Sequence, residues 1–161
     1  FWEQLFAPVP GAFHHPYQAG PADAFSAGFR ERRRDAIEAR FALLAGADLP
    51  TVLADAWRRY CGYQCQWVDW RRLSEALVVR AAQCIPFEHL AGTWERLLFD
   101  PADNRRGFPD LVALGDAPGD YALYEVKGPG DALQEHQRRW LNHFARLGMP
   151  AAVLQVSWAD D

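Results

Sequence analysis

The feature that most constrains the fold is the last third of the chain, where the hydrophobic period changes from segment to segment. Residues 108–114 and 121–127 are rich in β-formers and are separated by the turn sequence Gly-Asp-Ala-Pro-Gly-Asp. This pair predicts a β-hairpin. A Gly-Pro-Gly sequence ends the second strand, an amphipathic stretch follows, and residues 151–158 form a further predicted strand. The order strand, strand, helix, strand predicts an α/β core built on a mixed sheet.

The amphipathic stretch predicts a helix over residues 132–147, with Asp131 as its N-cap and Gly148 just past its end. One position on its apolar stripe is polar, namely Gln137. A buried amide needs hydrogen-bond partners, and either the edge of the sheet or the backbone could supply them. The stripe consists of Leu133, Gln137, Trp140, Leu141, Phe144 and Leu147.

The chain before residue 100 is predicted to be a helical segment that leads into this core. Residues 64–70 are expected to form a short strand or an aromatic loop, and the polar segment 100–107 an irregular loop. Apolar residues recur at helical spacing in four stretches, which are residues 25–44, 50–60, 73–84 and 87–99.

The composition is that of a globular domain. Of the 161 residues, 50% are hydrophobic, yet no apolar run is long enough to cross a bilayer and no signal peptide is recognisable. We therefore expect an intracellular protein without a membrane partner, located in the cytoplasm or nucleoid of a bacterium or in the nucleus of a eukaryote. The chain begins at Phe1, inside an apolar run, which indicates the C-terminal fragment of a longer protein.

The cysteines do not predict a disulfide framework, because there are three of them, Cys61, Cys65 and Cys84. A zinc site that combines them with His89 is conceivable. Free cysteine more often behaves as a small buried hydrophobe, and we expect free thiols here. The histidines lack a zinc-like pairing, and we expect them on the surface or in packing roles.

The charged residues are unusual in one respect. All but one of the 17 basic residues are arginine, and the exception is Lys127. A lysine that stands alone in such a composition indicates a need for a compact ammonium group. The net charge of −4 argues weakly against a nucleic-acid partner. Arginine pairs such as Arg105–Arg106 are nevertheless suited either to a phosphate contact or to a solvated surface.

Alternation along the second predicted strand places Glu125 and Lys127 on the same face. Asp110, on the first strand of the hairpin, can approach Glu125. Two converging carboxylates form a hard oxygen site for Mg²⁺ or Mn²⁺, and the carbonyl of Val126, between the two inward-facing residues, is a further candidate ligand. Such a site is typical of phosphodiester hydrolysis, with Lys127 orienting water or stabilising negative charge. The alternative is an ordinary exposed Glu-x-Lys pattern.

Longer sequence matches favour the catalytic interpretation. The segments RRGFPDLVAL and YEVKGPGDALQEHQRRWL resemble the VRR-NUC domain of the PD-(D/E)xK nuclease superfamily. More narrowly, the chain resembles the Fanconi-associated nuclease family. That resemblance extends upstream through YQAGPADAF, the EAR of residues 38–40 and the WVDW segment, so it covers most of the chain.

The resemblance implies a restriction-endonuclease-like PD-(D/E)xK core over residues 100–161. In that core Asp110, Glu125 and the Val126 carbonyl would be metal ligands, Lys127 the catalytic lysine, and Gln137 a further active-site residue. A glutamate that the family carries upstream would precede Phe1, and Glu3 does not match it. We expect Arg105 and Arg106, which precede the strand of Asp110, to contact a substrate phosphate.

The family further implies a structure-selective DNA nuclease that is monomeric in its full-length form. Its substrates would be 5′ flaps and other branched DNA, cut in the repair of interstrand crosslinks. Two alternatives remain open at this point. One is a catalytically silent DNA-binding or interaction module that keeps the fold, and the other is a dimeric nuclease that resolves Holliday junctions.

Overall fold

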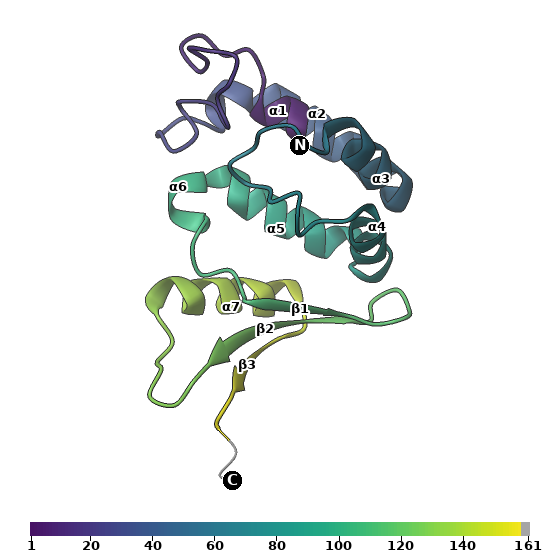
Figure 1. The fold of residues 1–161 in the computed structure, drawn as a ribbon, viewed down its shortest axis with the longest axis vertical. Coiled ribbons are helices and arrows are strands. Elements are labelled where there is room, and N and C mark those ends of the chain that lie inside the picture. Colours follow the sequence, from purple (N-terminus) through teal and green to yellow (C-terminus); the bar gives the residue numbers. More distant parts are fainter. Residues whose placement is uncertain (159–161) are drawn as a thin grey trace.

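The computed structural model describes residues 1–158 and consists of a helical part followed by a small sheet with one covering helix (Figure 1). The helical part contains α1 to α6 and the short 3₁₀ helix η1. Strands β1 and β2, helix α7 and strand β3 follow in the predicted order. The bounds are α1 Trp2–Leu5, η1 Glu31–Arg33, α2 Arg34–Ala45, α3 Leu49–Tyr60, α4 Glu75–Cys84, α5 Phe87–Phe99, α6 Pro101–Asn104, β1 Leu111–Leu114, β2 Tyr121–Lys127, α7 Glu135–Leu147 and β3 Ala151–Gln155.

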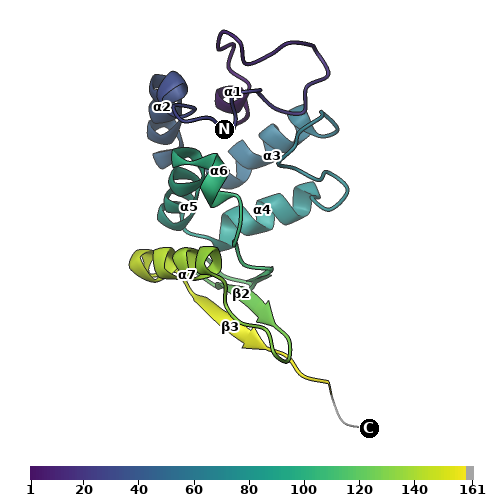
Figure 2. The same ribbon diagram turned by 90° about the vertical axis from the view of Figure 1, so that its left-hand side faces the viewer.

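The sheet is mixed, as predicted, with three strands in the order β1-β2-β3. Strand β1 pairs with β2 in antiparallel register, Leu111 opposite Tyr124. Strand β3 pairs with β2 in parallel register, so a crossover must join them, and α7 provides it. Figures 1 and 2 both show α7 lying between the sheet and the helical part. The central strand β2 therefore has a neighbour on each edge and a helix over one face.

Strand β2 owes its position to strict alternation along its sequence. Its residues are buried at odd positions and half-buried at even positions over the whole of Tyr121–Lys127. The first two odd residues pack with α7 in the apolar core, which buries apolar area at roughly 25 cal/mol per Å². The buried members of that core are Cys84, Tyr121, Leu123, Trp140, Phe144 and Met149.

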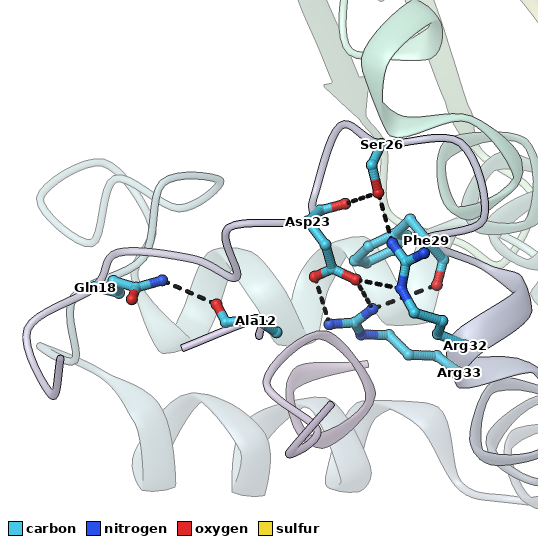
Figure 3. A network of polar contacts seen from close by, with 7 residues as sticks. All are labelled: Ala12, Gln18, Asp23, Ser26, Phe29, Arg32 and Arg33. Atoms are coloured by element: carbon cyan, nitrogen blue, oxygen red, sulfur yellow. Dashed lines mark hydrogen bonds and ion pairs between the residues drawn. The ribbon is translucent and has the colours of Figure 1, made fainter. Parts of the chain in front are cut away.

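The N-terminal helices differ from the prediction at one place. Residues 25–30 form turns instead of the expected start of a helix, and the regular helix α2 begins only at Arg34. Gly28 adopts a positive φ of 88°, which interrupts helical geometry. The buried Arg33 guanidinium donates to both carboxylate oxygens of Asp23, at 2.8 and 2.9 Å (Figure 3). This long-range ion pair overrides the local helical pattern.

The same network holds the long N-terminal loop against the helices. Arg33 also donates to the carbonyl of Phe29, and Arg32 donates to Asp23 at 2.7 Å (Figure 3). Gln18 donates to the carbonyls of Ala12 and Gly20 at 3.0 Å each, which fixes the preceding turn. The loop is therefore ordered by polar contacts where it lacks regular structure.

The structure also bears on two loops and on the cysteines. Residues 64–70 form turns without a strand, and the predicted loop at 100–107 contains the one-turn helix α6, capped by the Asp100 carboxylate. The three cysteines are free thiols. Across residues 1–158, none of the helices is both long and apolar enough to cross a membrane.

Candidate active site

Two charged side chains lie buried side by side at the C-terminal end of β2. Glu125 is 2% exposed and Lys127 is 7% exposed, and both point toward the side of the sheet that α7 covers. The Lys127 Nζ lies 3.0 Å from the Glu125 Oε1. A buried charge is costly unless it is paired and hydrogen-bonded, so this exposure excludes the ordinary surface Glu-x-Lys pattern.

Gln137 lies above this pair on α7. Its Nε2 donates to the Glu125 Oε1, and its Oε1 accepts a hydrogen bond from the backbone N–H of Gln134 at 2.9 Å. Both partners considered from the sequence are thus present, one at the sheet and one on the backbone. Because the Gln134 N–H occupies the oxygen end of the amide, the nitrogen end is the one directed at Glu125.

Asp110, in the bend just before β1, reaches the same end of β2. Its Oδ2 accepts a hydrogen bond from the backbone N–H of Val126 at 2.9 Å. The carboxylate therefore contacts the residue that separates Glu125 from Lys127. Asp110 is exposed, whereas Glu125 is buried, so the two carboxylates approach the strand end from the solvent side and from the interior.

The segment before Asp110 is fixed by α7. The indole N–H of Trp140 is shared between the carbonyls of Asn104 at 3.1 Å and Arg106 at 3.0 Å. Gly107 passes so close to the helix that an added Cβ would lie 2.6 Å from the backbone carbonyl carbon of His136, and its φ is 81°. A side chain at this position would force the segment away from α7. These contacts fix the backbone of residues 104–107, which leads to Asp110.

The loop between β2 and α7 corrects one prediction. Asp131 does not cap the helix, because its Oδ2 accepts from the backbone N–H of Gly128 at 3.0 Å and so closes a local turn. The helix begins at Glu135, and its N-cap is Gln134, whose side chain and that of Gln137 form a reciprocal capping box. Gln137 therefore both helps to cap the start of α7 and contacts Glu125.

The two candidate phosphate-binding arginines, Arg105 and Arg106, are both exposed. The guanidinium of Arg105 lies over the ring of Phe25, 4.4 Å from its centroid. The backbone of Arg106 is held by Trp140. Within residues 1–158, neither arginine forms an ion pair with a carboxylate, so both can meet an anion without breaking one.

Two histidines have packing partners, in line with the expectation from the sequence. The ring of His89 lies 2.7 Å from the hydroxyl of Tyr121, and burial raises the pKa of that hydroxyl to about 12. The ring of His143 lies 3.1 Å from the carbonyl of Gly92. The described residues contain no cluster of three or more His, Cys, Asp or Glu side chains arranged to hold a metal ion.

Three residues at this end of β2 carry oxygen donors that could serve a cation. They are the exposed carboxylate of Asp110, the second carboxylate oxygen of Glu125 and the carbonyl of Val126. Both contacts of Glu125 use Oε1, and among residues 1–158 no hydrogen bond engages Oε2. Such a set fits a hard divalent cation that completes its coordination with water.

Sequence reasoning missed several residues that position the site. Gln134 gave no N-cap signal, because Ser, Thr, Asp and Asn are the usual capping residues. Gly107 and Trp140 had a detectable signal. A glycine two residues before the Pro-Asp dipeptide indicates a close backbone approach, and a buried indole N–H needs an acceptor.

Known proteins resemble this chain over almost its whole length. The family model described as VRR-NUC domain matches residues 47–158. A Fanconi-associated nuclease 1 homolog of Pseudomonas aeruginosa is 42% identical over 99% of this chain and 29% of its own length. Fanconi-associated nuclease 1 of Danio rerio is 35% identical over 97% of this chain and 16% of its own length. The chain thus spans less than a third of either relative.

Solved structures give the same result. A crystal structure of paFAN1 bound to 5′ flap DNA with a two-nucleotide flap and a gap superimposes with a TM-score of 0.88. It is 41% identical and covers 99% of this chain and 30% of that chain. A second paFAN1 structure, with a one-nucleotide flap, gives a TM-score of 0.89 at 42% identity.

Proposed function

Because the chain belongs to the VRR-NUC family of nucleases and its relatives are Fanconi-associated nucleases, we propose that it is the catalytic part of a metal-dependent, structure-selective DNA nuclease. One observation carries the proposal. The buried pair Glu125–Lys127 and the carboxylate of Asp110 meet at the same end of β2. A fold without catalysis has little reason to bury an ion pair beside a second carboxylate.

The metal is proposed to be Mg²⁺ or Mn²⁺, since both favour carboxylate, carbonyl and water oxygens. Asp110, the Oε2 of Glu125 and the Val126 carbonyl would hold it. This set leaves coordination positions for water and for a phosphate oxygen. It also leaves room for a glutamate from the longer protein, which the family resemblance implies upstream of Phe1.

A divalent ion held there would neutralise charge on the scissile phosphate and lower the pKa of an attacking water. Lys127 places an ammonium within 3.0 Å of Glu125, so it can orient that water or stabilise the charge that develops on the phosphate. Gln137 holds the Oε1 of Glu125 and so orients the carboxylate. Asp110 is kept in place by the Val126 N–H.

The proposed substrates are 5′ flaps and related branched DNA, because the paFAN1 structures that this chain resembles contain 5′ flap DNA. We assign both flap endonuclease and 5′ exonuclease activity to the full-length protein, in the repair of interstrand crosslinks. Arg105 and Arg106 would contact a phosphate near the scissile bond, since both are exposed and lie a few residues before Asp110. The full-length protein would act as a monomer in the nucleoid or nucleus.

The experiment uses the full-length protein with a 5′ flap labelled at either end, in the presence of Mg²⁺ or Mn²⁺. Asp110→Asn and Lys127→Met should each reduce the cleavage rate at least about a hundredfold. The matched control is Asp116→Asn, an exposed aspartate in the turn of the same hairpin, which should cleave as the wild type does. Undiminished cleavage by both site variants would sink the proposal. A four-way junction tested alongside separates junction resolution from flap cleavage.

A further inference from the structure

The backbone of β2 distributes its hydrogen-bonding groups to two sides. Leu123 N donates to the Pro150 carbonyl at 2.9 Å, and the Lys127 carbonyl accepts from Val156 N at 2.9 Å. Odd-numbered residues of β2 therefore direct their N–H and C=O toward β3. Even-numbered residues direct both groups toward β1, and the N–H of Val126 does so by donating to Asp110. The Val126 carbonyl consequently faces the β1 edge of the site.

The ladder ends before that carbonyl receives a partner. The last pair is Leu111 opposite Tyr124, and continuing the register by two residues places Pro109 opposite Val126. In a regular antiparallel ladder, the residue at 109 would accept from the Val126 N–H and donate its own N–H to the Val126 carbonyl. Proline has no N–H to donate. The chain bends at Asp110, whose carboxylate takes over the acceptor role.

The result is an asymmetric ending, in which the N–H of Val126 is satisfied and its carbonyl is not. Outside the strand ladders, no backbone or side-chain group among residues 1–158 donates to this carbonyl. The carboxylate of Asp110 accepts from the N–H of the same residue, and Glu125 is the preceding residue of β2. A carbonyl free of a hydrogen bond keeps both lone pairs for a cation.

We propose that Pro109 is a positioning residue that keeps the Val126 carbonyl available to a divalent cation by withholding the N–H that would otherwise bond to it. The inference rests on the proposed function. It differs from a purely structural role, in which the buried Pro109 only ends the strand and fills space. A structural role depends on the shape of residue 109, whereas the proposed role depends on the absence of its N–H.

Two variants distinguish the effect of the side-chain shape at position 109 from the effect of its backbone N–H. Pro109→Ala introduces the N–H and shortens the side chain. Pro109→Val introduces the N–H and fills the buried position, which protects the test if the alanine variant folds poorly. The control is Pro150→Ala, which makes the same chemical change just before β3. The full-length protein is used for calorimetric Mn²⁺ titration and for hydrogen exchange of the metal-free form.

Both Pro109 variants should bind Mn²⁺ about tenfold more weakly, as is usual when the support of a metal ligand is removed. Cleavage should then need a correspondingly higher Mn²⁺ concentration. In the metal-free variants, the new amide at position 109 should exchange slowly because it donates to the Val126 carbonyl. Pro150→Ala should keep wild-type Mn²⁺ affinity.

The outcomes separate this inference from the proposed function. If the wild type binds Mn²⁺ and both Pro109 variants bind it equally tightly, the role of Pro109 is overturned and the nuclease proposal stands. The same holds if the new amide exchanges freely in a folded variant, or if Pro150→Ala weakens Mn²⁺ binding as much. If the wild type binds no Mn²⁺, both proposals fail together.

Discussion

Side chains of strand β2 contact helix α7 at both ends of the strand, but the two ends of this unit differ in character. At the apolar end, Tyr121 and Leu123 of β2 pack with Trp140 and Phe144 of α7. At the polar end, the same strand presents Glu125 and Lys127, and the same helix presents Gln137. Both ends are buried, since Phe144 is 0% exposed and Glu125 is 2% exposed.

On this contrast, the apolar end stabilises the fold and the polar end carries the proposed chemistry. Burial of apolar area at the apolar end lowers the free energy of the native state. At the polar end, the desolvation of two charges roughly offsets their attraction. The buried pair Glu125–Lys127 is thus a poor source of stability, and its presence points to function. If this division holds, substitutions at the two ends will affect different measurements.

The largest effect is expected from Glu125→Gln combined with Lys127→Met. This pair of changes removes both charges but keeps an acceptor for Gln137, so the free energy of unfolding should stay within about 1 kcal/mol of the wild type or rise. Flap cleavage should fall at least about a thousandfold. Lys127→Met alone leaves the Glu125 carboxylate unpaired and should lose about 3–5 kcal/mol. Urea unfolding measures the free energy of unfolding of the two variants, and flap-cleavage assays measure their rates. Equal destabilisation by the double and the single variant would contradict the division.

The apolar end should respond in the opposite way. Phe144→Ala leaves a cavity in the core and should lower the free energy of unfolding by about 3–5 kcal/mol. The folded protein should still bind Mn²⁺, because the carboxylates lie at the other end of the unit. Leu43→Ala is the control, since Leu43 on α2 is 56% exposed and its loss should change stability by less than about 0.5 kcal/mol. A Phe144 variant that is stable but does not bind Mn²⁺ would reverse the assignment.

Gln137 lies at the polar end and offers a smaller, more selective test. Gln137→Leu removes the hydrogen bond to Glu125 together with half of the capping box. Stability should fall by about 1 kcal/mol, and Mn²⁺ affinity about tenfold. Gln134→Ala removes only the other half of the capping box and leaves the Gln134 N–H bonded to Gln137. Its stability should fall similarly while Mn²⁺ affinity is kept. Calorimetry that finds equal Mn²⁺ affinities for the two variants would show that Gln137 acts through helix capping alone.

The two ends also differ in how far the sequence reveals them. Alternation in Tyr121–Lys127 was sufficient to place Glu125 and Lys127 on one face, because side-chain direction in a strand depends only on parity. The apolar stripe of α7 likewise identified Gln137 as a polar group facing the sheet. These features follow from local periodicity, and the structure agrees with them.

The features that could not be predicted depend on competition between local and distant partners. Asp131 has the residue type and position of an N-cap, but it closes a turn on Gly128 instead, and the helix starts four residues later than Asp131. Apolar spacing predicted a helix from Phe25, but the pairing of Arg33 with Asp23 and the positive φ of Gly28 prevent it. Periodicity contains no information on which of two available hydrogen bonds forms.

The smallest expected effect concerns His143, which lies beside the apolar end. Burial is the largest influence and lowers the pKa of its imidazole below 6.5, although the hydrogen bond to the Gly92 carbonyl opposes it. The charges of Arg96 and Arg146 lower the pKa further, and that of Glu95 raises it slightly. The unfolded chain therefore binds a proton more readily, so stability should fall as the pH drops below about 6.5 and level off below the folded-state pKa. One proton contributes at most about 1.4 kcal/mol per pH unit, and the half-exposed ring should contribute less.

His143→Gln keeps a donor for the Gly92 carbonyl but cannot be protonated. Urea unfolding at pH 7.5 and 5.5, roughly one unit on either side of the reference value, should therefore show a smaller loss of stability in this variant than in the wild type. The control His14→Gln replaces an exposed ring and should keep the wild-type loss. Equal losses for His143→Gln and the wild type would mean that the apolar end tolerates a charge at its margin, which would weaken the contrast between the two ends.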